Sequence, residues 1–146
     1  MNYFTAIFSI LISIGCFWMS IKMIRLYLKV KKWERITATV TSKEIFIHPK
    51  YSTSRSPYGL KVSYSYSKNG IEYTGHTVYL AELLGGQANH MKATVERKMN
   101  KISDSMSVFV NPADPNQAVM YCDGIGLYVF VFFMGLMSLL VGFSNL

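Results

Sequence analysis

The feature that most constrains this chain is where its charges lie. All fifteen Lys and Arg residues and all eight Asp and Glu residues fall between Lys22 and Asp123, so residues 1–21 and 124–146 carry no side-chain charge. A helix needs roughly 20 mostly apolar residues to cross the ~30 Å hydrocarbon core of a bilayer. Both uncharged segments meet that length. The sequence therefore predicts two transmembrane helices, residues 1–21 and 124–146, on either side of a polar domain.

Two other interpretations of these segments fit less well. A chain of 146 residues has too little mass to bury two such helices completely inside a soluble domain. The first segment also lacks the basic n-region and the small-residue cleavage site of a secretory signal peptide. We therefore expect a multi-pass protein of the plasma (inner) membrane that keeps both segments.

The orientation follows from a cluster of cations after the first helix. Lys and Arg beside a membrane segment are retained on the cytoplasmic side. The sequence therefore predicts a cytoplasmic domain over residues 22–123, with both termini outside. Residues 22–34 contain no Gly or Pro, which favours a basic juxtamembrane extension of the helix. Its cations can contact anionic lipid headgroups, each contributing about 1 kcal/mol. The expected membrane-surface residues are Lys22, Arg25, Lys29, Lys31, Lys32 and Arg35.

Because the cations cluster beside the first helix, the net charge of +7 indicates contact with the membrane rather than a nucleic-acid site. No nucleic-acid recognition motif is present, so we expect membrane lipids and no nucleic acid among the partners.

Each apolar segment carries a stripe of small residues at helical spacing. Small side chains let helix backbones approach closely in lipid. The stripes leave open whether the helices pair within one molecule or between two copies of a homo-oligomer. The packing residues expected from this pattern are Ser9, Ser13, Gly135, Ser138 and Gly142.

The polar domain, residues 35–122, alternates in the manner of β-strands. Residues 35–47 and 60–66 place apolar and polar side chains on opposite faces, and so do residues 71–75 after an Asn69-Gly70 turn. Asn-Gly between two alternating runs is a strong hairpin signal. From Ala88 to Ile102 the apolar spacing changes to 3–4 residues, which predicts a short amphipathic helix. Strands over residues 106–110 and 118–121, joined by a turn at 111–115, complete the domain.

The predicted fold class is therefore a membrane α+β protein. Two transmembrane helices flank a small, mostly antiparallel β domain that carries one short amphipathic helix.

One segment, residues 48–59, interrupts this order with two prolines and several polar residues. Long loops in compact domains are often functional, although a plain flexible connection is an equal alternative. Tyr and Arg are favoured at binding hot spots. The expected partner-binding residues are Tyr51, Arg55 and Tyr58 in this loop, with Lys92, Glu96 and Arg97 on the helix.

Several pieces together resemble a known family. Trp33 follows the first membrane helix, a Tyr-rich strand with Val62, Tyr64 and Tyr66 comes next, and NGIEYTG spans residues 69–75. The segment SVFVNPADPNQAVM then spans residues 107–120 before the second membrane helix. This order resembles the domain-of-unknown-function 3592 family of small, mostly bacterial membrane proteins. Val110 replaces the family's usual aromatic residue. The resemblance implies a membrane-embedded β-rich domain and no particular reaction.

No sequence motif points to catalysis. The chain has no G-x-S-x-G, Walker, H-E-x-x-H or C-x-x-C pattern, and we expect no catalytic, cofactor or metal residues. His48, His76 and His90 are isolated from other ligand types along the sequence. Asp114 lies between two prolines, where Asp usually bonds its own backbone. We expect Tyr64, Tyr66 and Tyr73 to form the packed face of the sheet, with a ligand-stacking platform as the alternative.

The functional prediction is an anchored β-rich domain that binds a protein partner without catalysis. It would act as an accessory subunit of a membrane assembly or as an immunity-type protector against a membrane-acting toxin. The alternative is a ligand or lipid sensor, or an enzyme, with a pocket between sheet and membrane. A polar cluster such as His76, Glu82 and His90 would favour that alternative.

Overall fold

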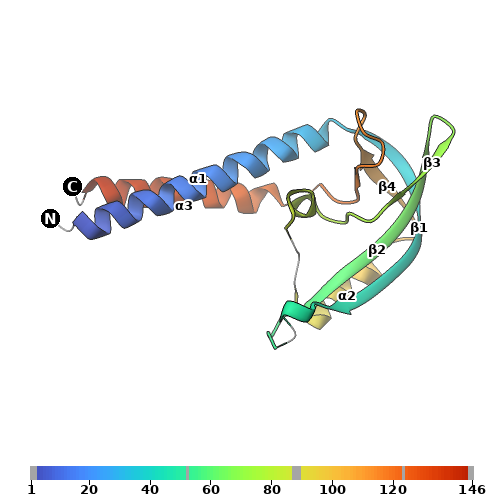
Figure 1. The fold of residues 1–146 in the computed structure, drawn as a ribbon, viewed down its shortest axis with the longest axis horizontal. Coiled ribbons are helices and arrows are strands. Elements are labelled where there is room, and N and C mark those ends of the chain that lie inside the picture. Colours follow the sequence, from blue (N-terminus) through green and yellow to red (C-terminus); the bar gives the residue numbers. More distant parts are fainter. Residues whose placement is uncertain (1–2, 52, 87–89, 123, 145–146) are drawn as a thin grey trace. The chain divides into compact units, whose positions relative to one another are not determined.

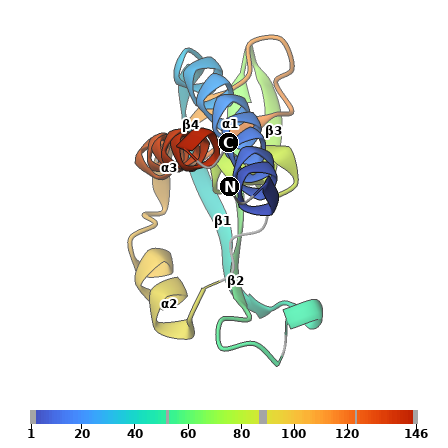
Figure 2. The same cartoon turned by 90° about the vertical axis from the view of Figure 1, so that its left-hand side faces the viewer.

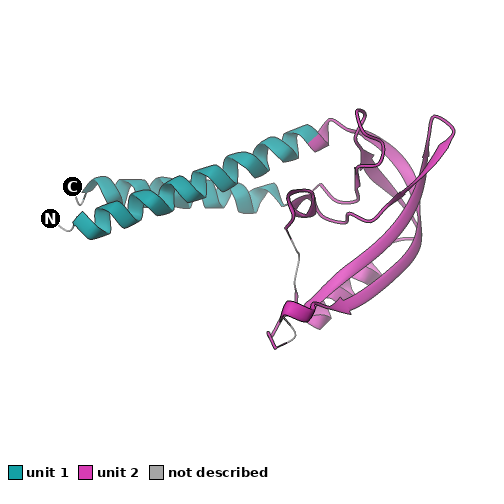
Figure 3. Cartoon of the chain, in the orientation of Figure 1, with its two compact units in different colours: residues 1–29, 124–146 teal, residues 30–123 magenta. Residues whose placement is uncertain are grey.

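The computed structural model of the chain describes residues 3–51, 53–86, 90–122 and 124–144, with the side chain of Tyr51 excepted. The chain divides into two compact units. The first combines residues 1–29 with residues 124–146, and the second comprises residues 30–123 (Figure 3). Each unit is described by itself.

The first unit consists of two helices, α1 (Tyr3–Lys31) and α3 (Ile125–Ser144). Both are long and apolar enough to cross a membrane. The helix α1 continues past residue 21 without a break and ends at Lys31, where the Trp33 N–H donates to the Val30 carbonyl. Glu34 is already the first residue of a strand, so the helix stops short of the predicted residue 34.

The second unit is built on a five-stranded sheet (Figure 1). Every neighbouring pair is antiparallel. Together with the short helix and the two apolar helices, this sheet confirms the predicted α+β class. In the order β3-β2-β1-β4-β5, the strands are β3 (Ile71–Gly75), β2 (Tyr58–Lys68), β1 (Glu34–Ile47), β4 (Ser105–Val110) and β5 (Ala118–Val119).

The predicted hairpin between β2 and β3 is confirmed. Asn69 and Gly70 both have positive φ, 55° and 79°. Positive φ at both central residues is the type I′ turn, whose twist matches that of the flanking strands. The turn fixes the register that pairs Tyr66 with Tyr73 and Tyr64 with Gly75.

Strict alternation gives the sheet two different faces. Ala38 of β1, Tyr64 of β2 and Val108 of β4 are buried in the core. The opposite face is lined by hydroxyl side chains that stand beside each other across the strands, because Thr37 pairs with Ser107 and Thr39 with both Ser65 and Ser105. This face is therefore the solvated side of an antiparallel sheet.

The tyrosines of the hairpin belong to the packed face, as predicted. Tyr64 and Tyr66 are buried, and the rings of Tyr66 and Tyr73 stack with centroids 5.8 Å apart. The Tyr64 hydroxyl lies 2.9 Å from the Thr77 carbonyl oxygen and 3.1 Å from that of Ala118, and it can donate to both. Burial raises the pKa of Tyr64, so this hydroxyl keeps its proton and remains a donor.

Two predicted boundaries, the end of the loop after β1 and the start of the amphipathic helix, are wrong. The loop after β1 is shorter than 48–59, because Tyr58 and Gly59 belong to β2 and pair with Ile47 and Phe46. A short 3₁₀ helix, Pro49–Tyr51, lies within that loop. The helix α2 (Lys92–Asn100) begins later than Ala88, which lies outside the described residues.

The last strand is also shorter than predicted. β5 ends at Val119, and Tyr121 instead forms a single parallel bridge with Tyr79. Tyr79 itself directly precedes a second 3₁₀ helix, Leu80–Leu84.

The turn between β4 and β5 is held by its own side chains. Asn111 Oδ1 accepts from the Ala113 N–H at 3.0 Å, and Asp114 Oδ1 accepts from the Asn116 N–H at 3.2 Å. Asp114 therefore acts as a turn residue in the way such residues usually do.

Candidate binding surfaces

One candidate surface lies at the C-terminal end of β1. Ile47 pairs with Tyr58, and Tyr58 in turn forms an isolated antiparallel bridge with His90. The bridge has two backbone hydrogen bonds, from the His90 N–H to the Tyr58 carbonyl at 2.9 Å and from the Tyr58 N–H to the His90 carbonyl at 3.2 Å. Since His90 comes just before α2, this bridge brings the loop and the helix to one end of the sheet (Figures 1 and 2).

Large apolar side chains are exposed at this end. Phe46 is 37% exposed, Ile47 53% and Met91 62%. The cations Lys50, Arg55 and Lys92 are exposed close to them along the chain. We call the set Phe46, Ile47, Arg55, Tyr58, Met91 and Lys92 the distal surface.

The predicted partner-binding residues are placed as follows. Arg55 is exposed in the loop, whereas Tyr58 is a half-buried strand residue. On α2, Lys92, Glu96 and Arg97 are all exposed, and Lys92 Nζ lies 3.9 Å from Glu96 Oε1. The side chain of Tyr51 lies outside the described residues. The bridge between Tyr58 and His90 thus brings together the loop and α2, which the sequence left as two separate candidate surfaces.

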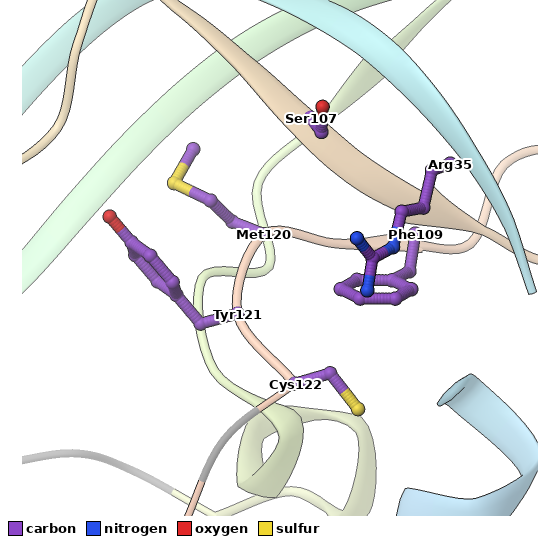
Figure 4. A pocket seen from close by; sticks show the side chains of 6 residues that line it. All are labelled: Arg35, Ser107, Phe109, Met120, Tyr121 and Cys122. Carbon is purple, nitrogen blue, oxygen red and sulfur yellow. The ribbon is translucent and has the colours of Figure 1, made fainter.

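A second candidate lies at the opposite end of the sheet, where the chain enters β1. Arg35 pairs with Phe109 across β1 and β4, and its guanidinium carbon lies 4.9 Å from the centroid of that ring. Figure 4 shows the guanidinium over the ring and, beyond it, the side chains that follow β5. These side chains together line an open hollow of about 270 Å³, which we call the Arg35 pocket. It is lined by Arg35, Ser107, Phe109, Met120, Tyr121 and Cys122.

A smaller hollow of about 210 Å³ shares Tyr121 with the Arg35 pocket. It is lined by Tyr79, Lys98, Lys101 and Tyr121. The rings of Tyr79 and Tyr121 stack with centroids 6.1 Å apart, and Lys98 Nζ lies 4.6 Å from the Tyr79 centroid. Lys98 Nζ is also 2.8 Å from His90 Nε2. Burial, together with the charge of Lys98, lowers the pKa of His90, which favours the neutral imidazole as an acceptor.

The polar cluster that would favour an enzyme or sensor does not gather as a unit. His76 Nδ1 lies 3.0 Å from Ser63 Oγ, Glu82 accepts from the Val78 N–H, and His90 faces Lys98. Burial raises the pKa of Glu82, and the backbone N–H groups of residues 78 and 79 oppose that rise. Within the described part of the chain, no three His, Cys, Asp or Glu residues are placed to share a metal ion.

The small residues of α1 and α3 meet inside one chain. Ser13 Oγ donates to the Gly135 carbonyl at 2.8 Å, and Ser138 Oγ donates to the Ser9 carbonyl at 3.0 Å. Gly142 is buried, and a β-carbon built there would lie 3.5 Å from Ser9 Cβ. The direction of this register, in which residue 9 meets 138 and residue 13 meets 135, makes the helices antiparallel.

The six predicted membrane-surface cations are all exposed. Lys22 Nζ lies 5.6 Å from the centroid of the Trp18 ring, which is itself 69% exposed. Arg35 differs from the other five because it lies on a strand and over an aromatic ring.

Sequence reasoning missed the aromatic partners in both hollows. Phe109 lies in the strand predicted over residues 106–110, but only the β1–β4 register sets it beside Arg35. Nothing in the sequence brought Tyr79 to Tyr121, since that bridge joins two irregular segments.

Comparison with known proteins identifies a family for the second unit. Neither the curated proteins nor the solved structures gave a significant match to the chain. Residues 36–124 match the family described as Domain of unknown function (DUF3592), and this match covers more than half of the chain and nearly the whole second unit. The chain therefore belongs to the DUF3592 family.

Proposed function

We propose that this protein is a two-helix membrane protein that holds a small β domain at the cytoplasmic face of the membrane to bind a protein partner, without catalysis. It would serve as an accessory subunit of a membrane assembly or as an immunity-type protector. The observation that carries the proposal is the distal surface, in which exposed apolar side chains lie close along the chain to exposed cations.

The composition of the distal surface supports a protein partner. Protein interfaces combine an apolar, often aromatic, centre with a polar rim. Phe46, Ile47 and Met91 supply exposed apolar area, while Arg55 and Lys92 supply positive charge beside it. The hydroxyl side chains of Thr39, Ser65 and Ser105 on the opposite face of the sheet offer neither feature. A partner with an acidic rim around an apolar centre would complement this surface.

The exposure of the two apolar helices supports the membrane anchor. In the most apolar stretch of α1 only 17% of residues are buried, and in that of α3 only 11%. A core helix of a soluble protein would be mostly buried. In lipid, the same exposed Phe, Leu, Ile and Met side chains are in a favourable solvent.

A site-specific photo-crosslinker tests the partner proposal. The crosslinking residue replaces Ile47 or Met91 in the full chain, and it replaces Thr39 on the hydroxyl face as the control. After irradiation of native membranes, we expect one common crosslinked protein from positions 47 and 91 and none from position 39. Equal products from all three positions, or none at 47 and 91, would reject the distal surface as the binding site.

Charge reversal provides a second, independent test of the distal surface. Arg55→Glu combined with Lys92→Glu should reduce the crosslinked product at Ile47 by about tenfold or more, since charged interface contacts contribute roughly 1.5 kcal/mol or more. The matched control is Lys61→Glu, which reverses an exposed charge on β2. A crosslink to a second copy of this chain would identify the homo-oligomer as the partner complex.

The orientation is tested with a membrane-impermeant maleimide. A single Cys replaces the exposed Ser54 in a chain without Cys16 and Cys122. We expect labelling only after the membrane is opened, because the juxtamembrane cations keep the domain inside. Labelling of intact cells would place the domain outside.

A further inference from the structure

Beyond the proposed protein partner, we propose that the Arg35 pocket binds the phosphate of an anionic phospholipid headgroup. The pocket, at the end of the sheet through which the chain leaves for its apolar helices, offers one guanidinium for the phosphate. It also offers an aromatic and sulfur-lined wall for the carbon atoms next to the phosphate.

The charge in this pocket is available to an anion. The guanidinium of Arg35 stacks on Phe109, and no carboxylate among the described residues lies within salt-bridge distance of it. Glu34, the acidic neighbour of Arg35 in sequence, instead pairs with Lys68 at 3.2 Å. Guanidinium groups bind phosphate oxygens through a planar fork of donors, and stacking on a ring holds that plane in place.

The walls suit a headgroup better than a free ion. Phe109, Met120 and Tyr121 present apolar surface next to Arg35, and the Ser107 hydroxyl is the small polar group on the same strand (Figure 4). The pocket thus has both polar and apolar lining, which matches a phosphate joined to carbon atoms better than a bare ion. A volume of about 270 Å³ is small for a whole drug-sized ligand. It is consistent with one headgroup entering while the acyl chains stay outside.

The chain itself keeps this pocket near α3. Cys122 in the pocket wall precedes Ile125, the first residue of α3, by three residues. Three residues span at most about 11 Å even when fully extended. If α3 crosses the bilayer, its first residue lies at the boundary of a headgroup layer that is roughly 5–7 Å thick on each side. The pocket is therefore within reach of headgroups without any assumption about how the two units are oriented.

The test compares lipids retained by the full chain. The protein is reconstituted in nanodiscs with equal amounts of phosphatidylglycerol and phosphatidylcholine, and the lipids that remain after detergent extraction are counted by native mass spectrometry. Wild type should retain phosphatidylglycerol preferentially. Arg35→Gln should reduce it about tenfold, as expected for one charge-assisted hydrogen bond of roughly 1.4 kcal/mol. Phe109→Leu, which keeps an apolar side chain but removes the ring, should cause a smaller loss.

Two matched controls remove one cation each from other places. Arg97→Gln alters α2, and Lys29→Gln alters the basic end of α1. Both should leave the retained phosphatidylglycerol within about twofold of wild type. Thermal unfolding of each variant checks that the fold is kept. If Arg35→Gln does not fold, the lipid retention of Phe109→Leu still tests the pocket.

Three results would overturn the proposal. The first is retention of phosphatidylcholine and phosphatidylglycerol in equal amounts by wild type. The second is an equal loss in Lys29→Gln and Arg35→Gln, which would assign the lipid to the basic helix end. The third is displacement of phosphatidylglycerol by soluble glycerol phosphate at a matched concentration, which would identify a soluble phosphate ester as the ligand.

Discussion

The ring of Tyr64 covers the α-carbon of Gly75, its partner on the neighbouring strand. A β-carbon at position 75 would collide with Cε2 and Cζ of that ring. The ring cannot move away, because Tyr64 is fully buried and its hydroxyl is held by two carbonyl groups. Gly75 is thus required by close packing and not by its backbone conformation.

Replacing this glycine should weaken the domain. We expect Gly75→Ala to lower the free energy of unfolding by about 1–3 kcal/mol, the usual cost of overpacking a core. Denaturant titration of the full chain in detergent, followed by the circular dichroism of the sheet, measures this. Gly59→Ala is the control, since its β-carbon would lie 2.6 Å from Phe46 Cζ but Phe46 is 37% exposed and can rotate away. Equal losses in both variants would contradict the argument.

The hydrogen bonds of the Tyr64 hydroxyl lead to a second prediction. Tyr64→Phe keeps the ring over Gly75 but leaves the carbonyl groups of Thr77 and Ala118 without this donor. A buried acceptor that loses its partner costs about 1–3 kcal/mol, and the same denaturant titration should detect it. Tyr73→Phe, at a half-buried position, should cost less than about 0.5 kcal/mol. A Tyr64→Phe variant as stable as Tyr73→Phe would contradict the assigned hydrogen bonds.

The packing of α1 on α3 can be tested with the native Cys16. A β-carbon at position 135 would lie 3.0 Å from Cys16 Cβ, close to the 3.5–4.5 Å range of disulfides. Under mild oxidation, Gly135→Cys in a Cys122→Ser chain should form a disulfide inside one monomer. Non-reducing electrophoresis and peptide mapping would show it.

The control for this crosslink is Gly126→Cys in the same chain. Among the described residues, no atom beyond the neighbouring backbone of α3 lies within 4 Å of a β-carbon built at position 126, so a Cys there should not react with Cys16. A covalent dimer from Gly135→Cys would show that the small-residue stripes meet between two copies instead.

The stability of the domain should also depend on His90 at mildly acidic pH. Burial and the neighbouring Lys98 lower the pKa of His90 below its ordinary value of 6.5. Just below pH 6.5 the unfolded chain therefore binds more protons than the folded one, and stability falls as pH decreases through this value. His90→Gln removes the titration but keeps an acceptor for Lys98.

The measurement compares the unfolding midpoints of wild type and His90→Gln at about pH 7.5 and about pH 5.5. When the pH is lowered from about 7.5 to about 5.5, wild type should lose more stability than His90→Gln. The raised pKa of Glu82 acts in the opposite direction, since its contribution decreases as pH rises, but it is present in both proteins and cancels in the comparison. Equal pH dependence in the two proteins would exclude His90 as the source.

Local patterns predicted much of this fold because they report local physics. Two uncharged runs of membrane-spanning length, strict alternation and an Asn69-Gly70 turn each act within a few residues, so their elements appear where expected. The errors are at boundaries. Tyr58 and Gly59 looked like loop residues, yet pairing with Ile47 and Phe46 extends β2 through them.

The sequence by itself determined the class of the protein: two apolar helices, a basic stretch after the first one, and an antiparallel β domain of the DUF3592 family. Periodicity and charge carry this information without any long-range contact. Only the tertiary structure decided which distant residues meet. Strand register sets Arg35 over Phe109, and a single bridge between Tyr58 and His90 joins the loop to α2. Those contacts depend on how segments far apart in the chain pair with each other, which no local pattern specifies.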